Sequence, residues 1–191
     1  MTAGKIAALA LLLALSRPGA LRAEDRWAVT LYGGKTSFTS FMDVVRFNTD
    51  SRRSYLATLA LSREFARWGE NLAWEWETNV VKHSGMQDHF EFNALLFLRW
   101  HRFPWDGFVD TTFGLGAGPS YALEKPPVEI AQHETVSKLL NQLSAELTFA
   151  RPGDSRWSAV IRIHHRSGAN GVIRGVSGGS NFYCAGIRYH F

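Results

Sequence analysis

The chain has few of the features that cross-link or anchor a protein. Its 191 residues include one cysteine, Cys184, which excludes an internal disulfide framework. Its one long apolar run, Ile6 to Leu15, is shorter than the roughly 20 residues that a membrane-spanning helix needs. No second run of that kind follows, so the sequence predicts no transmembrane helix.

Residues 1–23 have the three parts of a secretory signal peptide: Lys5, the apolar run, and small residues after Pro18. We expect cleavage after Ala23, which leaves residues 24–191 as a single domain. Cleavage removes three basic residues and lowers the formal net charge from +4 to about +1. No block of Lys or Arg remains, so nucleic acid is excluded as a partner.

The remaining sequence has almost no helical periodicity and instead alternates between two kinds of side chain, which is typical of β-strands. In the clearest segment, Phe90, Phe92 and Leu96 share one face, while Glu91 and Asn93 share the other. Eight such segments are predicted, at about 26–34, 55–67, 71–82, 89–101, 108–121, 139–150, 156–167 and 180–191.

The number and length of these segments predict an all-β fold, an eight-stranded antiparallel transmembrane β-barrel of the bacterial outer membrane. Short turns at one end and longer loops at 35–54, 122–138 and 168–179 fit this class, with both termini in the periplasm. The final strand closes on Phe191, as in the assembly signal of outer-membrane proteins. Aromatic residues fall at the predicted periplasmic strand ends, where an interfacial girdle belongs: Trp27, Trp68, Phe149, Trp157, Tyr189 and Phe191.

A secreted lipocalin-like barrel is the alternative, because it has the same strand number with its apolar face inward. The aromatic girdle, the terminal aromatic strand and the lack of Gly-x-Trp near the first strand favour the membrane barrel.

In a membrane barrel the polar face points inward and holds both signs of charge. An eight-stranded barrel is just wide enough for side chains to fill, so we expect an internal ion-pair network and no open pore. Gly114, Gly116 and Gly118 on this face predict room for bulky neighbours. The inward charged residues are Glu75, Glu77, Glu91, Asp110, Glu146, Arg99, Arg162 and Arg188.

The histidines near the predicted outer loops, His83, His89 and His133, match no metal-site spacing, and we assign no metal. The segment Val128 to Leu140 could form a short helix in the third loop, with Val136 and Leu139 on one side.

The seventh segment carries the candidate chemistry. Its outward face is apolar up to Ile163 and then turns polar at His165 and Ser167, at the outer-leaflet interface. Residues two apart on a strand lie on one face about 6 to 7 Å apart, so an imidazole can reach the hydroxyl. Such a pair can act as base and nucleophile. Alternatively, the polar residues mark only the end of the apolar band.

The stretch Ile163 to Gly171, on the seventh strand of an exported barrel, resembles the lipid A 3-O-deacylase family of the bacterial outer membrane. The resemblance implies hydrolysis of an ester-linked acyl chain of lipopolysaccharide, with His165 as general base and Ser167 as nucleophile. It implies no cofactor. Backbone amides near Gly168 and Ala169 would hold the oxyanion, with Asn170 close by.

Two positions depart from the family pattern. Gly168 stands where the family commonly has Asn, and the stretch Val176 to Asn181 lacks the expected Glu. Asn181 lies on the outward face and could orient His165 by a hydrogen bond, as asparagine does in cysteine proteases. It could also only cap the loop.

Two functions therefore stay open. The first is a lipid A esterase. The second is a non-enzymatic barrel whose loops, including Arg46, Arg52 and Arg53, contact lipopolysaccharide, a host surface or another envelope protein. A homodimer also stays open.

Overall fold

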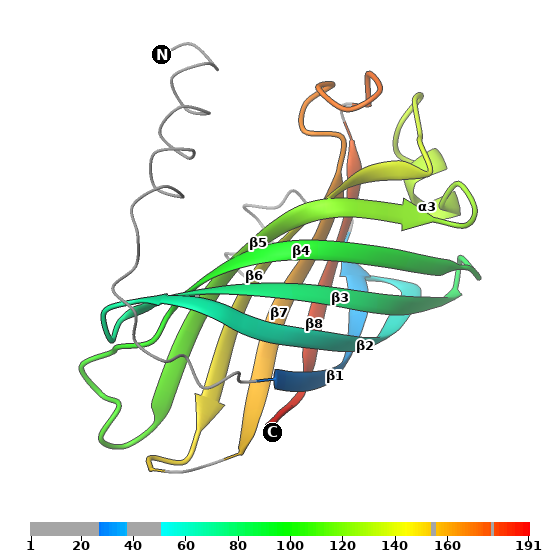
Figure 1. Ribbon diagram of the computed structural model, residues 1–191. Coiled ribbons are helices and arrows are strands. Elements are labelled where there is room, and N and C mark those ends of the chain that lie inside the picture. The colour runs from blue at the N-terminus through cyan, green and yellow to red at the C-terminus, as the bar shows by residue number, and fades with distance from the viewer. Residues whose placement is uncertain (1–26, 38–50, 154–155, 177) are drawn as a thin grey trace.

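The structure is a computed structural model that describes residues 27–37, 51–153, 156–176 and 178–191. The predicted signal peptide and most of the first loop, with Arg46, lie outside these residues. Eight antiparallel strands form a closed barrel in sequence order, with β8 pairing back onto β1 (Figure 1). The elements are β1 (Trp27–Ser37), β2 (Ser51–Trp68), β3 (Leu72–Gly85), β4 (Phe90–Trp100), β5 (Asp110–Ala122), α3 (Pro127–Ile130), β6 (Leu139–Ala150), β7 (Trp157–Ser167) and β8 (Gly179–His190).

All eight predicted strands are confirmed, and β1 and β2 extend beyond their predicted bounds, to Ser37 and from Ser51. The short helix expected over Val128 to Leu140 is largely wrong. Only α3 is helical, and Leu139 and Leu140 begin β6 because they pair with β5 opposite Tyr121 and Ser120. None of the helices in the described residues is long and apolar enough to cross a membrane.

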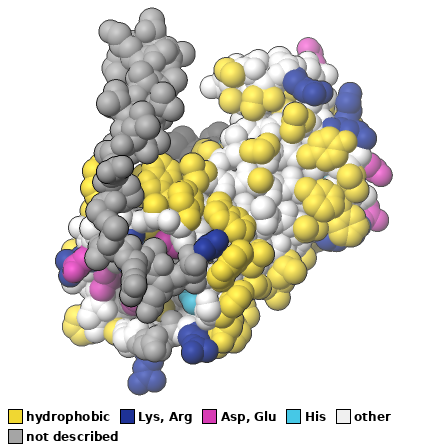
Figure 2. Space-filling view, in the orientation of Figure 1, with side chains coloured by type: hydrophobic (Ala, Val, Ile, Leu, Met, Phe, Trp, Pro, Cys, Tyr) yellow, Lys and Arg dark blue, Asp and Glu magenta, His cyan; other side chains and the backbone are white. Residues whose placement is uncertain are grey.

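The two faces of the barrel wall have opposite chemistry. Leu31, Leu59 and Ile161 lie outside with more than half of their surface exposed, and Figure 2 shows apolar side chains spread over the visible face. Glu77 and Arg162, by contrast, are buried inside. This is the arrangement of an outer-membrane barrel and the reverse of a lipocalin, so the soluble alternative is wrong.

Ion pairs fill the middle of the barrel. The Arg162 guanidinium donates to both carboxylate oxygens of Glu77, at 2.6 and 2.7 Å, and to Glu146 at 2.7 Å. Arg99 and Arg188 complete the network, and three arginines therefore face three glutamates: Arg99, Arg162 and Arg188 against Glu75, Glu77 and Glu146. The predicted internal network is confirmed for six of the eight predicted residues, and its charges balance. Glu91 is also buried but contacts His83 and His164, and Asp110 lies at the start of β5, outside the network.

The glycines of β5 admit a large neighbour, as predicted. A Cβ on Gly116 would lie 2.6 Å from the Phe97 ring, and one on Gly114 would lie 3.2 Å from it. Gly118 has a different reason, since its Cβ would meet the backbone oxygen of Ala94 at 1.9 Å. Phe97 is fully buried and closes the lumen beside the arginines.

The start of β1 and the end of β8 lie at one end of the barrel, together with the β2–β3, β4–β5 and β6–β7 connections (Figure 1). We call this the periplasmic end, following the predicted topology. The other connections, and α3, lie at the opposite end, so β7 runs from the periplasmic end to the outer end. The expected contrast in loop length is only partly right. The β3–β4 connection at the outer end is short, at 86–89, close to the shorter connection that the sequence predicts at 83–88. The periplasmic β4–β5 connection, at 101–109, is longer than a tight turn and is ordered by Asp106, which accepts from the N–H groups of Phe103 and Thr111.

Candidate active site

His165 and Asn181 face each other on neighbouring strands at the outer end of the wall. The β7–β8 register places them directly opposite, and both side chains project outward. The His165 Nδ1 atom lies 2.5 Å from the Asn181 Oδ1 atom, so Nδ1–H donates to the amide oxygen. That bond fixes the tautomer and leaves Nε2 as the nitrogen able to accept a proton.

Ser167 follows two residues later on the same face and is the last residue of β7. Its side chain is partly exposed, and its Oγ accepts the backbone N–H of Ala169 at 3.0 Å. Ala169 and Asn170 turn the chain with φ angles of 52° and 54°. The turn therefore brings a backbone amide up to the hydroxyl oxygen.

Gly168 is held by the opposite limb of the β7–β8 connection. Its N–H donates to the Gly178 carbonyl at 3.0 Å, and a Cβ at this position would lie 2.0 Å from the Val176 carbonyl oxygen. The close approach explains why glycine stands where the resembled family has asparagine. Of the predicted oxyanion donors, the Gly168 amide is engaged in the turn and the Ala169 amide points at Ser167.

Behind the outward pair, the inward face of β7 anchors the third loop. Arg166 donates to both oxygens of Glu129 at 2.6 and 2.7 Å, and to the carbonyls of Ser137 and Lys138 at 2.9 and 2.6 Å. Ser180 also donates to Glu129. The loop that carries α3 is therefore fixed to the two strands that carry His165, Ser167 and Asn181, a role for Glu129 that the sequence did not indicate.

A basic cleft of about 590 Å³ lies at the same end of the barrel. Strand β6 connects Ser167 with this cleft. Ser167 pairs with Asn141 on β6, and Leu139, two residues earlier on β6, lines the cleft. The lining residues are Tyr121, Lys125, Val136, Ser137, Lys138, Leu139, Arg174 and Val176. The three cations come from β5–β6 and β7–β8, and no sequence motif links them.

The structure also gathers histidines that were assigned no role and places them beside Glu91. His83, His89 and Glu91 offer one ligand atom each within 4.8 Å of one another inside the barrel. His133 lies apart from them, with Nε2 3.3 Å from the Gly179 carbonyl. Arg53 is exposed at the outer end of β2, and the side chain of Arg52 lies outside the described residues.

No protein-family model and no curated protein matches the chain. Among solved structures, the chain is similar to the outer membrane enzyme PagL, with a TM-score of 0.56 and 12% sequence identity over 84% of this chain and 98% of PagL. Neisserial surface protein A is also similar, with a TM-score of 0.51 and 10% identity over 87% of this chain and 97% of the other. These likenesses fix the fold: the protein is an eight-stranded barrel of the bacterial outer membrane.

Proposed function

We propose that the protein is a serine esterase that hydrolyses an ester-linked acyl chain of lipid A in the outer leaflet, as a 3-O-deacylase does. The observation that carries the proposal is the 2.5 Å contact between His165 and Asn181, with Ser167 next on the same face. An outward pair suits this substrate, because the lumen is filled by Arg162 and Phe97 and the acyl ester can approach from the membrane.

In the proposed reaction, the Ser167 oxygen attacks the ester carbonyl while His165 Nε2 takes the hydroxyl proton. The tetrahedral oxyanion collapses, the carbon–oxygen bond to the sugar breaks, and His165 returns the proton to the leaving alkoxide. Water then hydrolyses the acyl-enzyme by the same steps. Ala169 is the proposed amide donor to the oxyanion, once its N–H turns from Ser167 Oγ to the carbonyl oxygen.

The surroundings support this choice of substrate. Lys125, Lys138 and Arg174 at the cleft would attract the phosphates of lipid A, while the apolar outer wall would hold its acyl chains. The similarity to an outer membrane enzyme adds support at the level of the fold.

Mass spectrometry of lipid A from outer membranes that contain the protein tests the proposal. The unmutated protein should remove one ester-linked hydroxyacyl chain, and Ser167→Ala should remove none. Ser84→Ala is the matched control, since Ser84 is exposed near the outer end of β3 and away from His165. Identical lipid A with the unmutated protein and Ser167→Ala, both shown to be folded by a heat-dependent gel shift, would refute the esterase.

The basic cleft also favours a second candidate, a non-enzymatic barrel that binds lipopolysaccharide. Replacing Lys125 and Arg174 together by Gln should then weaken lipopolysaccharide binding, while Ser167→Ala leaves both binding and lipid A unchanged.

A further inference from the structure

We propose that the outer end of the barrel interior is a zinc site whose protein ligands are His83, His89 and Glu91. The inference is independent of the proposed esterase, since these residues point into the lumen. Zinc prefers imidazole nitrogen and carboxylate oxygen in a tetrahedral arrangement, and three protein ligands are sufficient for binding. The three ligand atoms lie within 4.8 Å of one another, whereas tetrahedral ligands lie about 3.3 Å apart. Side-chain rotations that bring these atoms closer by up to about 1.5 Å would therefore let all three bind one zinc ion.

His89 points most directly to a missing partner. It is 4% exposed, and neither of its ring nitrogens has a hydrogen-bond partner among the described residues. Its ring stacks on His83 with the centroids 4.5 Å apart. Leaving a buried polar group without a partner is costly, and binding to a metal ion would give a nitrogen of this kind its partner.

Gln87 gives the second indication. It is buried in the β3–β4 turn, its amide nitrogen lies 2.9 Å from His83 Nδ1, and its Oε1 atom has no partner among the described residues. A rotation of the Gln87 amide group by 180° exchanges the positions of its oxygen and nitrogen atoms. With Oε1 toward His83, it accepts the Nδ1–H, as the outer partners of metal-bound histidines do, and the Nε2 lone pair faces Glu91.

The distribution of charged side chains inside the barrel also supports a metal ion beside Glu91. The three arginines of the central network balance three glutamates, and Arg166 is bonded to both oxygens of Glu129. Glu91 instead has His83 at 3.1 Å and His164 at 3.0 Å, with Arg166 Nε at 3.9 Å. Among the described residues, Arg166 donates its hydrogen bonds to groups other than Glu91, and a divalent metal between Glu91 and His83 would add positive charge there.

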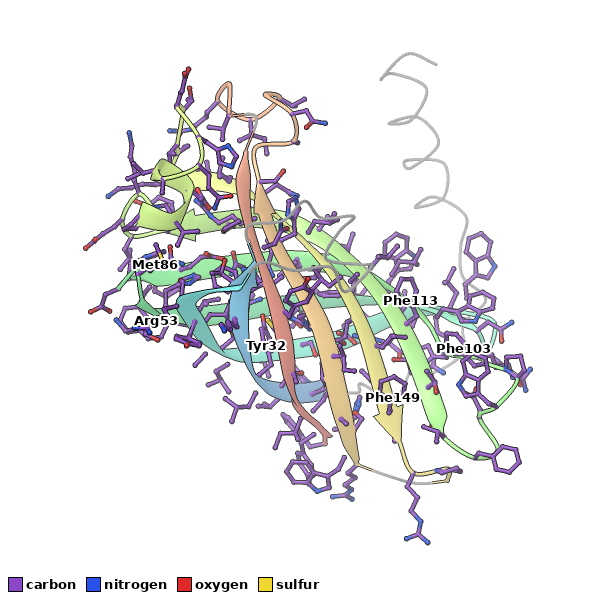
Figure 3. The ribbon with its side chains drawn as sticks, turned by 180° about the vertical axis from the view of Figure 1, so that it is seen from behind. Tyr32, Arg53, Met86, Phe103, Phe113 and Phe149 are labelled. Atoms are coloured by element: carbon purple, nitrogen blue, oxygen red, sulfur yellow. The ribbon has the colours of Figure 1, made fainter. Side chains whose placement is uncertain are left out.

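The site would hold the β3–β4 turn in place. His83 and His89 flank that turn. Within the turn, the Met86 N–H donates to the carbonyl of Arg53 on β2, and Figure 3 labels Met86 and Arg53 at the outer end of the barrel. A hydrogen bond between His164 Nε2 and Glu91 Oε1, at 3.0 Å, links Glu91 to β7.

The test is zinc binding by the whole barrel, folded in detergent micelles, treated with chelator and then titrated with ZnCl₂ in a calorimeter. We expect one zinc per chain, retained after dialysis and counted by plasma mass spectrometry, and visible absorption typical of tetrahedral coordination when Co²⁺ replaces Zn²⁺. His89→Ala should weaken binding by about 100-fold or more, and Glu91→Gln should do the same with almost no change of shape. His133→Ala is the control and should change the affinity less than about threefold, because His133 lies outside the cluster.

Each variant is checked for folding by its heat-dependent gel shift. Failure of the folded, unmutated protein to retain zinc would overturn the proposal. Equal binding by the folded His89→Ala and Glu91→Gln variants would also overturn it, because the metal would then be held elsewhere.

Discussion

Replacing Asn181 by Asp tests the orienting role of this residue and should accelerate lipid A deacylation. The amide oxygen already accepts from His165 Nδ1 at 2.5 Å, so a carboxylate can keep the bond and add a negative charge beside the imidazolium formed in the reaction. Two charges about 4 Å apart attract by about 4 kcal/mol at an effective dielectric constant of about 20.

Burial reduces that gain. Asn181 is 9% exposed, and a buried carboxylate loses several kcal/mol of hydration unless it is well paired. A net gain of about 1.4 to 2.7 kcal/mol corresponds to a rate increase of about 10- to 100-fold. The loss of about 10⁴ when Asp becomes Asn in a serine protease sets the upper bound.

The assay is the initial rate of hydroxyacyl release from lipid A in detergent micelles, followed by mass spectrometry. Asn71→Asp is the matched control, because this substitution adds the same charge in the β2–β3 turn, at the opposite end of the barrel from His165. Asn181→Ala should slow the reaction at least about tenfold. A folded Asn181→Asp protein that is no faster than the unmutated one, together with an unaffected Asn181→Ala, would refute the reasoning.

Three further outcomes follow from the packing. Glu146→Gln removes a buried carboxylate from three arginines and should lower the free energy of unfolding by about 3 to 5 kcal/mol. Glu70→Gln, at an exposed ion pair, should change it by less than about 1 kcal/mol; urea unfolding in micelles measures both. Gly116→Ala should cost about 1 to 3 kcal/mol in the same assay, because its Cβ would lie 2.6 Å from Phe97. Gly168→Asn introduces the residue that the resembled family has at this position, yet it should reduce deacylation, because its Cβ would collide with Val176 in the β7–β8 connection; faster deacylation by this variant would contradict the prediction.

The positions of the strands were predictable because alternation has a period of two and each strand has two faces. The same rule placed Ser167 on the outward face of β7 together with His165. The loops were less predictable. The expected helix did not form over Leu139 and Leu140 because these residues pair with β5 as the start of β6. The β4–β5 connection is also longer than expected for a periplasmic turn.

The cluster of His83, His89 and Glu91 was missed in the sequence. His89 and Glu91 are two residues apart and share the inward face, and the antiparallel pairing of β3 with β4 brings His83 beside them. The three residues form a His-x5-His-x-Glu pattern that matches none of the common zinc motifs. Glu129 was also missed, and it meets Arg166 because a loop folds over the barrel end.

The sequence by itself predicted the class of the protein, because eight long two-faced strands with aromatic residues at their ends favour a closed barrel with a lipid-facing wall. The tertiary structure decided which face points inward, since the charged side chains find partners only when strands distant in sequence converge on them. It also decided that Asn181 faces His165, because the β7–β8 register sets that pair. Alternation fixes the face of each residue, but only pairing between strands fixes its neighbour.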